Sequence, residues 1–115
     1  MEKVIVDKSF EFAVRIVKLC RYLKSEKKEF ELASQLLNSG TSIGANVKEA
    51  QEAQSKKDFV SKMSIALKEA SETEYWLELL YRTESLTKQE YESMRNDCKE
   101  LLKLLTAIVK NSKIN

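Results

Sequence analysis

Apolar residues recur at intervals of three and four positions along four long stretches of the chain, and short polar breaks separate these stretches. This spacing places the apolar side chains on one face of a helix, so each stretch is predicted to be an amphipathic α-helix. The predicted helices cover residues of about 8–24, 27–52, 56–82 and 88–112. Because breaks of a few residues leave consecutive helices antiparallel, the pattern predicts an all-α fold, a single antiparallel up-down-up-down four-helix bundle over residues 1–115.

Two of the predicted helix starts carry capping sequences. Ser55 and Thr87 each stand three positions before an acidic residue, Asp58 and Glu90 respectively. In such a pair the hydroxyl accepts a hydrogen bond from an early backbone N–H while the carboxylate reaches back to the cap residue. Ser55 and Thr87 are therefore predicted to begin the third and fourth helices.

The two glycines, Gly40 and Gly44, lie one helical turn apart within the predicted second helix. They stay in phase with the apolar stripe that contains Ile43 and Val47, which favours a helix through this stretch. Since a glycine costs about 1 kcal/mol of helix propensity relative to alanine, the pair is interpreted as a helix-packing motif that lets another helix approach closely. A turn at residues 38–41 is the alternative, because Asn-Ser-Gly-Thr is also typical of turns.

The first predicted helix carries more apolar surface than one face of a bundle needs. Two apolar stripes run along it, and together they form a sector of roughly 220°, whereas a bundle helix needs little more than 100°. The first stripe consists of Phe10, Ala13, Val17 and Cys20, and the second of Phe12, Ile16, Leu19 and Leu23. The third predicted helix has a similar excess beside its core stripe.

Surplus apolar surface of this kind is typical of an interface with a partner, so we expect the chain to associate with itself. The predicted oligomer interface combines the second stripe with the excess of the third helix: Phe12, Ile16, Leu19, Leu23, Ile65, Trp76 and Leu79. The alternative is that the N-terminal arm or a chain end folds back and covers this surface.

The composition excludes several classes of fold and chemistry. The 115 residues include two glycines, no proline and no histidine, whereas an all-β sandwich or barrel needs turn-forming residues in many places. Without histidine there is no Ser-His-Asp triad, no Cys-His dyad and no Glu-x-x-His di-iron site. We therefore expect a protein that is not an enzyme and has no cofactor. An all-helical enzyme with a pocket lined by Glu69, Glu72 and Arg15 is kept as a third hypothesis.

The two cysteines, Cys20 and Cys98, lie far apart in apolar helical patterns, so they are predicted to be buried, reduced thiols. No stretch approaches the roughly 20 apolar residues of a membrane span, and no signal peptide opens the chain. These features predict a cytoplasmic protein without contact to a membrane.

Lysines provide the candidate nucleic-acid site. The 20 basic and 18 acidic residues give a net charge of only +2, which is small for a nucleic-acid-binding domain. On the fourth predicted helix, however, four lysines lie within about 80° of one another by helical geometry: Lys99, Lys103, Lys110 and Lys113. Such a row can follow a phosphate backbone, and an ordinary solvated lysine face is the alternative.

Polar residues beside the core stripes of the second and third helices are candidates for a structural polar network, which has to be well satisfied to be tolerated. The candidates are Asn46, Glu49, Glu69 and Glu72. Acidic side chains of the third helix supply oxygen ligands of the type that hard cations prefer, but a solvated face or salt bridges are the favoured interpretation, and no metal is expected.

Two motifs resemble the signature of a bacterial protein family. The first, at residues 35–50, is QLLNSGTSIGANVKEA, and the second is Asp58-Phe59 followed by IALKEASETEYWL at residues 65–77. Both are similar to motifs of the four-helix-bundle proteins encoded in intervening sequences of 23S ribosomal RNA genes. Relatives of that family include the accessory variability determinant of diversity-generating retroelements. The resemblance extends over residues of about 8–110.

The resemblance implies a bundle that assembles into a ring-like homopentamer without known enzymatic activity. The retroelement relatives are strongly basic and bind nucleic acid and a reverse transcriptase, whereas this chain carries only +2 and has Leu37-Asn38 where many members have an arginine. We therefore expect a non-enzymatic oligomeric protein with a scaffold or accessory role and no small-molecule substrate. An RNA-binding accessory protein that uses the lysine row is the alternative.

Overall fold

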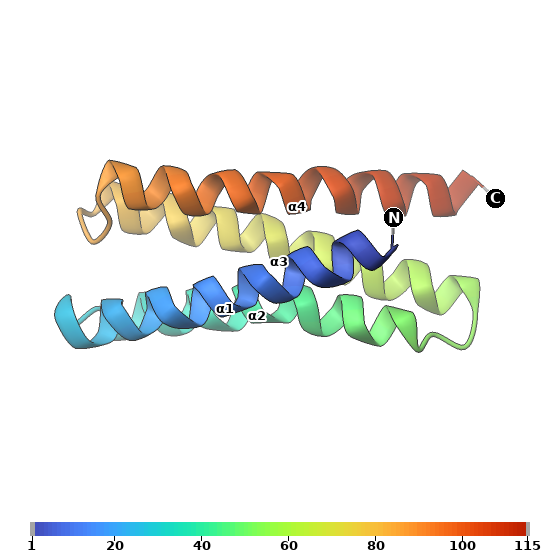
Figure 1. The fold of residues 1–115 in the computed structure, drawn as a ribbon, viewed down its shortest axis with the longest axis horizontal. Helices are drawn as coiled ribbons and strands as arrows, with labels where there is room; N and C mark the ends of the chain where they lie inside the picture. Colours follow the sequence, from blue (N-terminus) through green and yellow to red (C-terminus); the bar gives the residue numbers. More distant parts are fainter. Residues whose placement is uncertain (1, 115) are drawn as a thin grey trace.

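The computed structural model describes residues 2–114, which fold into four helices joined by short turns. The helices are α1 (Glu2–Glu26), α2 (Phe30–Gln51), α3 (Lys56–Arg82) and α4 (Lys88–Ile114). They run alternately up and down in a bundle of 46 × 20 × 19 Å, and α1 begins and α4 ends where α2 turns into α3 (Figure 1). The predicted all-α, up-down-up-down four-helix bundle is confirmed.

Each helix packs against its neighbours in the chain, and the bundle is closed by a thinner contact between α1 and α4. In the described part of the chain α1 and α3 make no packing contact with each other, so they lie diagonally across the bundle. The outward surfaces of α1 and α3 therefore point to opposite sides of the molecule.

The bounds of α3 agree with the predicted range, and the other helices differ at their ends. α1 begins at Glu2 rather than near residue 8, because Ile5 is fully buried in the core and needs helical backbone to reach it. α2 begins three residues after its predicted start, because Lys28 adopts a left-handed φ of 57° and reverses the chain there.

The hydroxyl of each predicted cap is in place, and the described hydrogen bonds include the returning carboxylate contact at Thr87. The Ser55 hydroxyl accepts a hydrogen bond from the backbone N–H of Asp58 at 3.0 Å. At the start of α4 the Glu90 N–H donates to the Thr87 hydroxyl at 3.1 Å, while the Thr87 N–H donates to the Glu90 carboxylate at 2.8 Å. Two backbone donors of this helix end are thus satisfied reciprocally.

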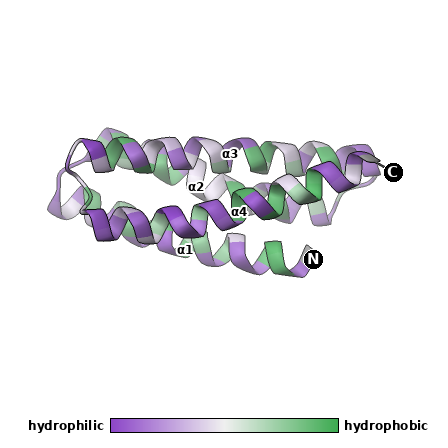
Figure 2. Cartoon of the chain, turned by 90° about the horizontal axis from the view of Figure 1, so that it is seen from above, coloured by the Kyte–Doolittle hydropathy of each residue, from purple (hydrophilic) through white to green (hydrophobic). Residues whose placement is uncertain are grey.

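One apolar core runs the length of the bundle, and hydrophobic and hydrophilic segments alternate along every helix (Figure 2). Each helix contributes fully buried side chains, among them Ile5, Ile16, Leu36, Ile43, Met63, Leu77, Leu101 and Leu105. α2 is continuous through residues 38–41, so the turn interpretation of that stretch is wrong. The burial of each large apolar side chain is worth about 1.5–3 kcal/mol, and this burial determines which way each helix is rotated.

Candidate interaction surfaces

The second apolar stripe of α1 fills the core of the single chain instead of forming an exposed surface. Phe12, Ile16 and Leu23 are 2%, 0% and 0% exposed, and Leu19 is half-buried against the core. The assignment of Phe12, Ile16 and Leu23 to an oligomer interface is therefore wrong. The physical reason is that α1 packs against α2 on one side and α4 on the other, so it needs an inward sector wide enough for both contacts.

The apolar surface that α1 leaves exposed includes Phe10 of its first stripe, whose Cys20 is buried, and Val14, which belongs to neither stripe. Phe10 is 70% exposed and Val14 is 41% exposed. With the half-buried side chains beside them, these residues form what we call the α1 face: Val6, Phe10, Ala13, Val14 and Val17. The first stripe contained Phe10, Ala13 and Val17 of this face, but nothing local indicated that they point outward.

Two hollows lie along the α1 face. The first has a volume of about 660 Å³ and lies between Val6, Phe10 and Ala13 of α1 and Gly44 and Ala45 of α2, with charged residues at its rim. The second has a volume of about 270 Å³ and is lined by Phe10, Ala13, Val14 and Val17, with Lys18 and Arg21 at its edge. The two hollows meet at Phe10 and Ala13.

Gly40 and Gly44 lie on the side of α2 that contacts α1. A Cβ on Gly40 would come within 2.8 Å of two carbons of Ile16, and a Cβ on Gly44 would be 3.3 Å from the Ser9 carbonyl oxygen. Both positions therefore allow α1 to approach α2 closely. Gly44 also forms part of the floor of the first hollow.

The predicted interface residues of α3 lie near the outward surface of that helix. Ile65 is 40% exposed, whereas Trp76 and Leu79 are half-buried. Tyr75, which the sequence analysis did not select, is 59% exposed and meets Trp76 edge-on, with ring centroids 5.0 Å apart. By helical spacing, Ile65, Tyr75 and Leu79 share the outward side of α3 with the charged residues Lys68 and Glu72. We call these five residues the α3 face.

Of the four candidates for a polar network, Glu69 and Glu72 contact each other on α3 and Glu69 also contacts Ser42 of α2, whereas Asn46 and Glu49 make separate contacts. Asn46 donates to the Ser42 carbonyl of its own helix at 2.8 Å. Glu49 crosses to α3 and pairs with Lys62 at 3.0 Å, and the hydrogen bond and charge of this carboxylate raise the pKa of Lys62. The buried polar link between α2 and α3 is instead the hydrogen bond between Ser39 and Thr73, at 3.0 Å.

Glu69 and Glu72 lie side by side on α3. Burial raises the pKa of the Glu69 carboxyl, and the neighbouring carboxylate of Glu72 raises it further. The charge of Lys68 and a hydrogen bond from Ser42 act in the opposite direction and lower the pKa of Glu69. Among the described residues, neither Glu69 nor Glu72 forms an ion pair. The ion pairs that are present involve other acidic residues.

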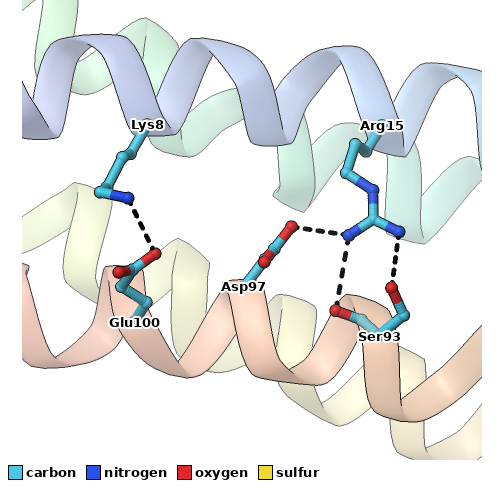
Figure 3. A network of polar contacts seen from close by, with 5 residues as sticks. All are labelled: Lys8, Arg15, Ser93, Asp97 and Glu100. Atoms are coloured by element: carbon cyan, nitrogen blue, oxygen red, sulfur yellow. Dashed lines mark hydrogen bonds and ion pairs between the residues drawn. The ribbon is translucent and has the colours of Figure 1, made fainter.

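A polar seam joins α1 to α4 (Figure 3). The Arg15 guanidinium donates to the Asp97 carboxylate at 2.6 Å and to the Ser93 hydroxyl at 2.8 Å, and Lys8 pairs with Glu100 at 3.2 Å. Arg15 is thus engaged by α4 rather than by acids of α3. The hypothesis of an enzyme pocket requires Arg15 to lie together with Glu69 and Glu72. The structure does not bring these three side chains together.

The four lysines of the predicted row lie on the exposed surface of α4: Lys99, Lys103, Lys110 and Lys113. At the end of the bundle Lys113 and Ser112 face the start of α3, where Lys56, Lys57 and Val60 complete a shallow hollow of about 320 Å³. The lysine row therefore continues onto α3, which the sequence pattern of one helix did not indicate.

Both cysteines are buried, free thiols, as predicted. Cys20 donates to the Ala33 carbonyl and Cys98 to the Ala70 carbonyl, each at 3.3 Å. Burial raises the pKa of Cys20 to about 11 and that of Cys98 to about 12. Within residues 2–114 there is no cluster of side chains suited to a metal ion, and no described helix is long and apolar enough to cross a membrane.

The fold and these surfaces define the class: an all-α four-helix bundle whose exposed features are two apolar faces and a row of lysines. A family model described as 23S rRNA-intervening sequence protein matches residues 1–107. The chain belongs to this family, as the resemblance of its motifs implied.

Among solved structures the chain is similar to a protein with unknown function from the S23 ribosomal protein family of Bacteroides thetaiotaomicron VPI-5482. The two chains are 60% identical, with 95% of this chain and 97% of that chain covered and a TM-score of 0.93. A search of curated proteins found no match to this chain.

Proposed function

We propose that this protein is a non-enzymatic, self-associating four-helix bundle that acts as a scaffold or accessory protein, and that its assembly is a homopentamer. The observation that carries the proposal is the α1 face, where Phe10 is 70% exposed beside an apolar hollow of about 660 Å³. The resemblance to 23S rRNA intervening-sequence proteins supports the pentameric number. The absence of histidine supports a role without acid–base catalysis, and the free thiols agree with a cytoplasmic location.

The single chain leaves several large apolar side chains in contact with water. Burying one large apolar side chain is worth about 1.5–3 kcal/mol, and aromatic residues dominate such contacts. Phe10, Val14 and Tyr75 are more than one-third exposed in the single chain. Interfaces that bury them repeat at every subunit of a ring, so several modest contacts add up to a stable assembly.

The test is a mass measurement by light scattering and by native mass spectrometry at micromolar concentration. We expect a discrete species of five times the 13.3 kDa chain mass. A stable monomer would contradict the proposal of self-association, and a discrete oligomer of another number would correct the pentamer alone.

We propose RNA binding through the lysine row as a second candidate function. It is supported by the exposure of Lys99 and Lys103 on α4 and by the lysine-lined hollow at the start of α3. In a ring these patches are multiplied, which strengthens the attraction to a phosphate backbone.

Binding to a structured RNA hairpin, titrated with salt, tests this second function. We expect affinity to fall steeply as salt rises and to weaken when Lys99 and Lys103 are both changed to alanine. The matched control replaces Lys24 and Lys27, which lie at the other end of the bundle on α1 and in the following turn. Undetectable or salt-insensitive binding at low salt contradicts RNA binding.

A further inference from the structure

The two apolar faces of the bundle lie on different sides of the molecule, because the α1 face borders the groove between α1 and α2 whereas the α3 face lies on the outward side of α3. The α1 face and the α3 face lie on helices that are diagonal to each other and make no mutual packing contact among the described residues. One chain therefore cannot bury its own α1 face against its own α3 face. When a second copy docks its α3 face on the α1 face of the first copy, the first copy keeps a free α3 face and the second copy keeps a free α1 face.

The shapes of the two faces are compatible. The α3 face presents two projecting apolar side chains, Ile65 and Tyr75, which are 40% and 59% exposed. They are ten residues apart, about 15 Å along a helix axis. The two hollows of the α1 face share Phe10 and Ala13, and the α1 residues that line them are centred about six residues apart, or about 9 Å. The projecting apolar side chains of one face thus have apolar hollows to enter on the other.

The charges on both faces determine the relative direction of the helices. Along α1, Glu11 lies at the first hollow, and Lys18 lies at the second. Along α3, Lys68 follows Ile65, and Glu72 precedes Tyr75. None of these four charged side chains has an ion pair among the residues that the structure describes.

In a parallel arrangement Lys68 lies opposite Glu11, and Glu72 lies opposite Lys18. In an antiparallel arrangement like charges oppose each other at both positions, which disfavours binding. Arg21, at the edge of the second hollow, is then placed to lie over the ring of Tyr75, a contact that attracts a guanidinium to an aromatic face.

We infer that the α1 face of one copy binds the α3 face of the next copy, with the two helices parallel. This inference rests on the proposed self-association and names its contact. α1 and α3 run in the same direction within a chain, so a repeated parallel contact keeps every copy in one orientation. The contact is heterologous, and it generates a closed ring or an open filament rather than a two-fold dimer.

A pair of complementary variants tests the contact. Phe10→Asp removes the α1 face but leaves the α3 face intact, and Tyr75→Asp does the reverse. We expect each variant alone to be a monomer. An equimolar mixture is expected to form a one-to-one complex of twice the 13.3 kDa chain mass, because only one intact pair of faces remains. A mixture that stays monomeric, or a variant that assembles like the wild type, overturns the inference.

The control variant is Phe30→Asp, since Phe30 is 57% exposed but lies at the start of α2, outside both faces. It is expected to assemble like the wild type. Circular dichroism melting of all three variants checks that each one folds. If the wild type is oligomeric while the variants of both faces still assemble, only this contact is wrong. A monomeric wild type overturns the proposed function and the contact together.

Charge reversal tests the parallel direction. Glu72→Lys is expected to raise the protein concentration needed for assembly at least tenfold, because it places a lysine opposite Lys18. Adding Lys18→Glu to the same chain is expected to restore most of the lost assembly. If Glu72→Lys alone strengthens assembly, because it places a lysine opposite Glu11, the antiparallel arrangement is supported and the inferred one is overturned.

Discussion

Gly40 of α2 lies directly against Ile16 of α1, so close that a Cβ on Gly40 would be 2.8 Å from both Cγ1 and Cγ2 of Ile16. Gly40→Ala would gain about 1 kcal/mol of helix propensity, but forcing a methyl group into a filled core costs about 1–3 kcal/mol. We expect a net loss of about 1 kcal/mol in the free energy of unfolding, measured by urea denaturation.

A double-mutant cycle isolates this contact. Ile16→Ala is expected to cost less in the Gly40→Ala background than in the wild type, with a coupling of at least about 0.5 kcal/mol. Additive effects of the two substitutions would show that the close approach of α1 to α2 does not depend on Gly40.

The buried hydroxyls of Ser39 and Thr73 form the polar link between α2 and α3. Thr73 is fully buried, and its hydroxyl is 3.0 Å from that of Ser39 and 2.8 Å from the Glu69 carbonyl. Thr73→Val keeps the shape but removes these bonds, so we expect a loss of about 1–2 kcal/mol by denaturant unfolding. Ser39→Ala combined with Thr73→Val is expected to cost less than the sum of the single changes, since no hydroxyl is then left without its partner. A strictly additive double variant would argue against the pair.

The ion pair between Arg15 and Asp97 is partly open to solvent, with the two side chains 41% and 46% exposed. Exposed pairs contribute about 0–1 kcal/mol and are weakened by salt. We expect Asp97→Asn to lower the unfolding free energy by about 0.5 kcal/mol at low salt and by less at high salt. Asn96→Asp, a change at the neighbouring exposed position, is the control. A loss that does not depend on salt would mean that packing rather than charge holds α1 to α4.

The cysteine thiols are predicted to make stability fall at alkaline pH. Burial raises the pKa of Cys20 to about 11 and that of Cys98 to about 12, from an ordinary value of 9.0. The folded chain therefore keeps protons that the unfolded chain releases, and unfolding becomes more favourable as the pH rises above 9. Comparing Cys98→Ala with the wild type between pH 8 and 11 isolates this contribution, because other groups titrate equally in both. The variant is expected to show the shallower decline, and an identical decline would refute the assignment.

The same burial protects the thiols from reagents. The thiolate is the reactive form, so at pH 8 we expect Cys20 and Cys98 to react with a thiol reagent only as fast as the chain opens. In denaturant both are expected to react at once. Fast labelling of the native protein would contradict the buried positions of the two thiols.

Glu84, in the turn between α3 and α4, adopts a left-handed φ of 70°. The Ser85 N–H donates to the Leu80 carbonyl at 2.9 Å, which is the hydrogen bond of a helix end that favours glycine at this position. We expect Glu84→Gly to raise the unfolding free energy by about 0.5–1 kcal/mol. Thr83→Gly, at a residue with a negative φ of −96°, is the control and is expected to destabilise the fold. Equal effects of the two glycines would show that the backbone conformation is not the cause.

The fold was predictable because its signals are local. The three- and four-residue spacing defined all four helices, and Ser55 and Thr87 marked two helix starts to the residue, since a cap is completed by groups only three positions away. The errors lie at ends that depend on distant contacts. α1 extends to include Ile5 because this side chain is buried in a core that other helices help to form. α2 begins late because Lys28 adopts a left-handed backbone conformation, which the residue type does not predict.

The candidate site was predictable only in part. Ile65, Trp76 and Leu79 lie near the outward surface of α3 because one apolar stripe of that helix is clearly the wider and longer one. On α1 the two stripes are of similar strength, so the spacing of apolar residues does not say which one points inward.

The sequence by itself determined the four helices, their order, two of their caps and the excess of apolar surface. Only the tertiary structure decided that Ile16 points into the core and Phe10 into solvent. The physical reason is that the rotation of α1 about its axis is set by the burial of its side chains against α2 and α4, such as Ile16 against Gly40, and no local pattern contains these contacts.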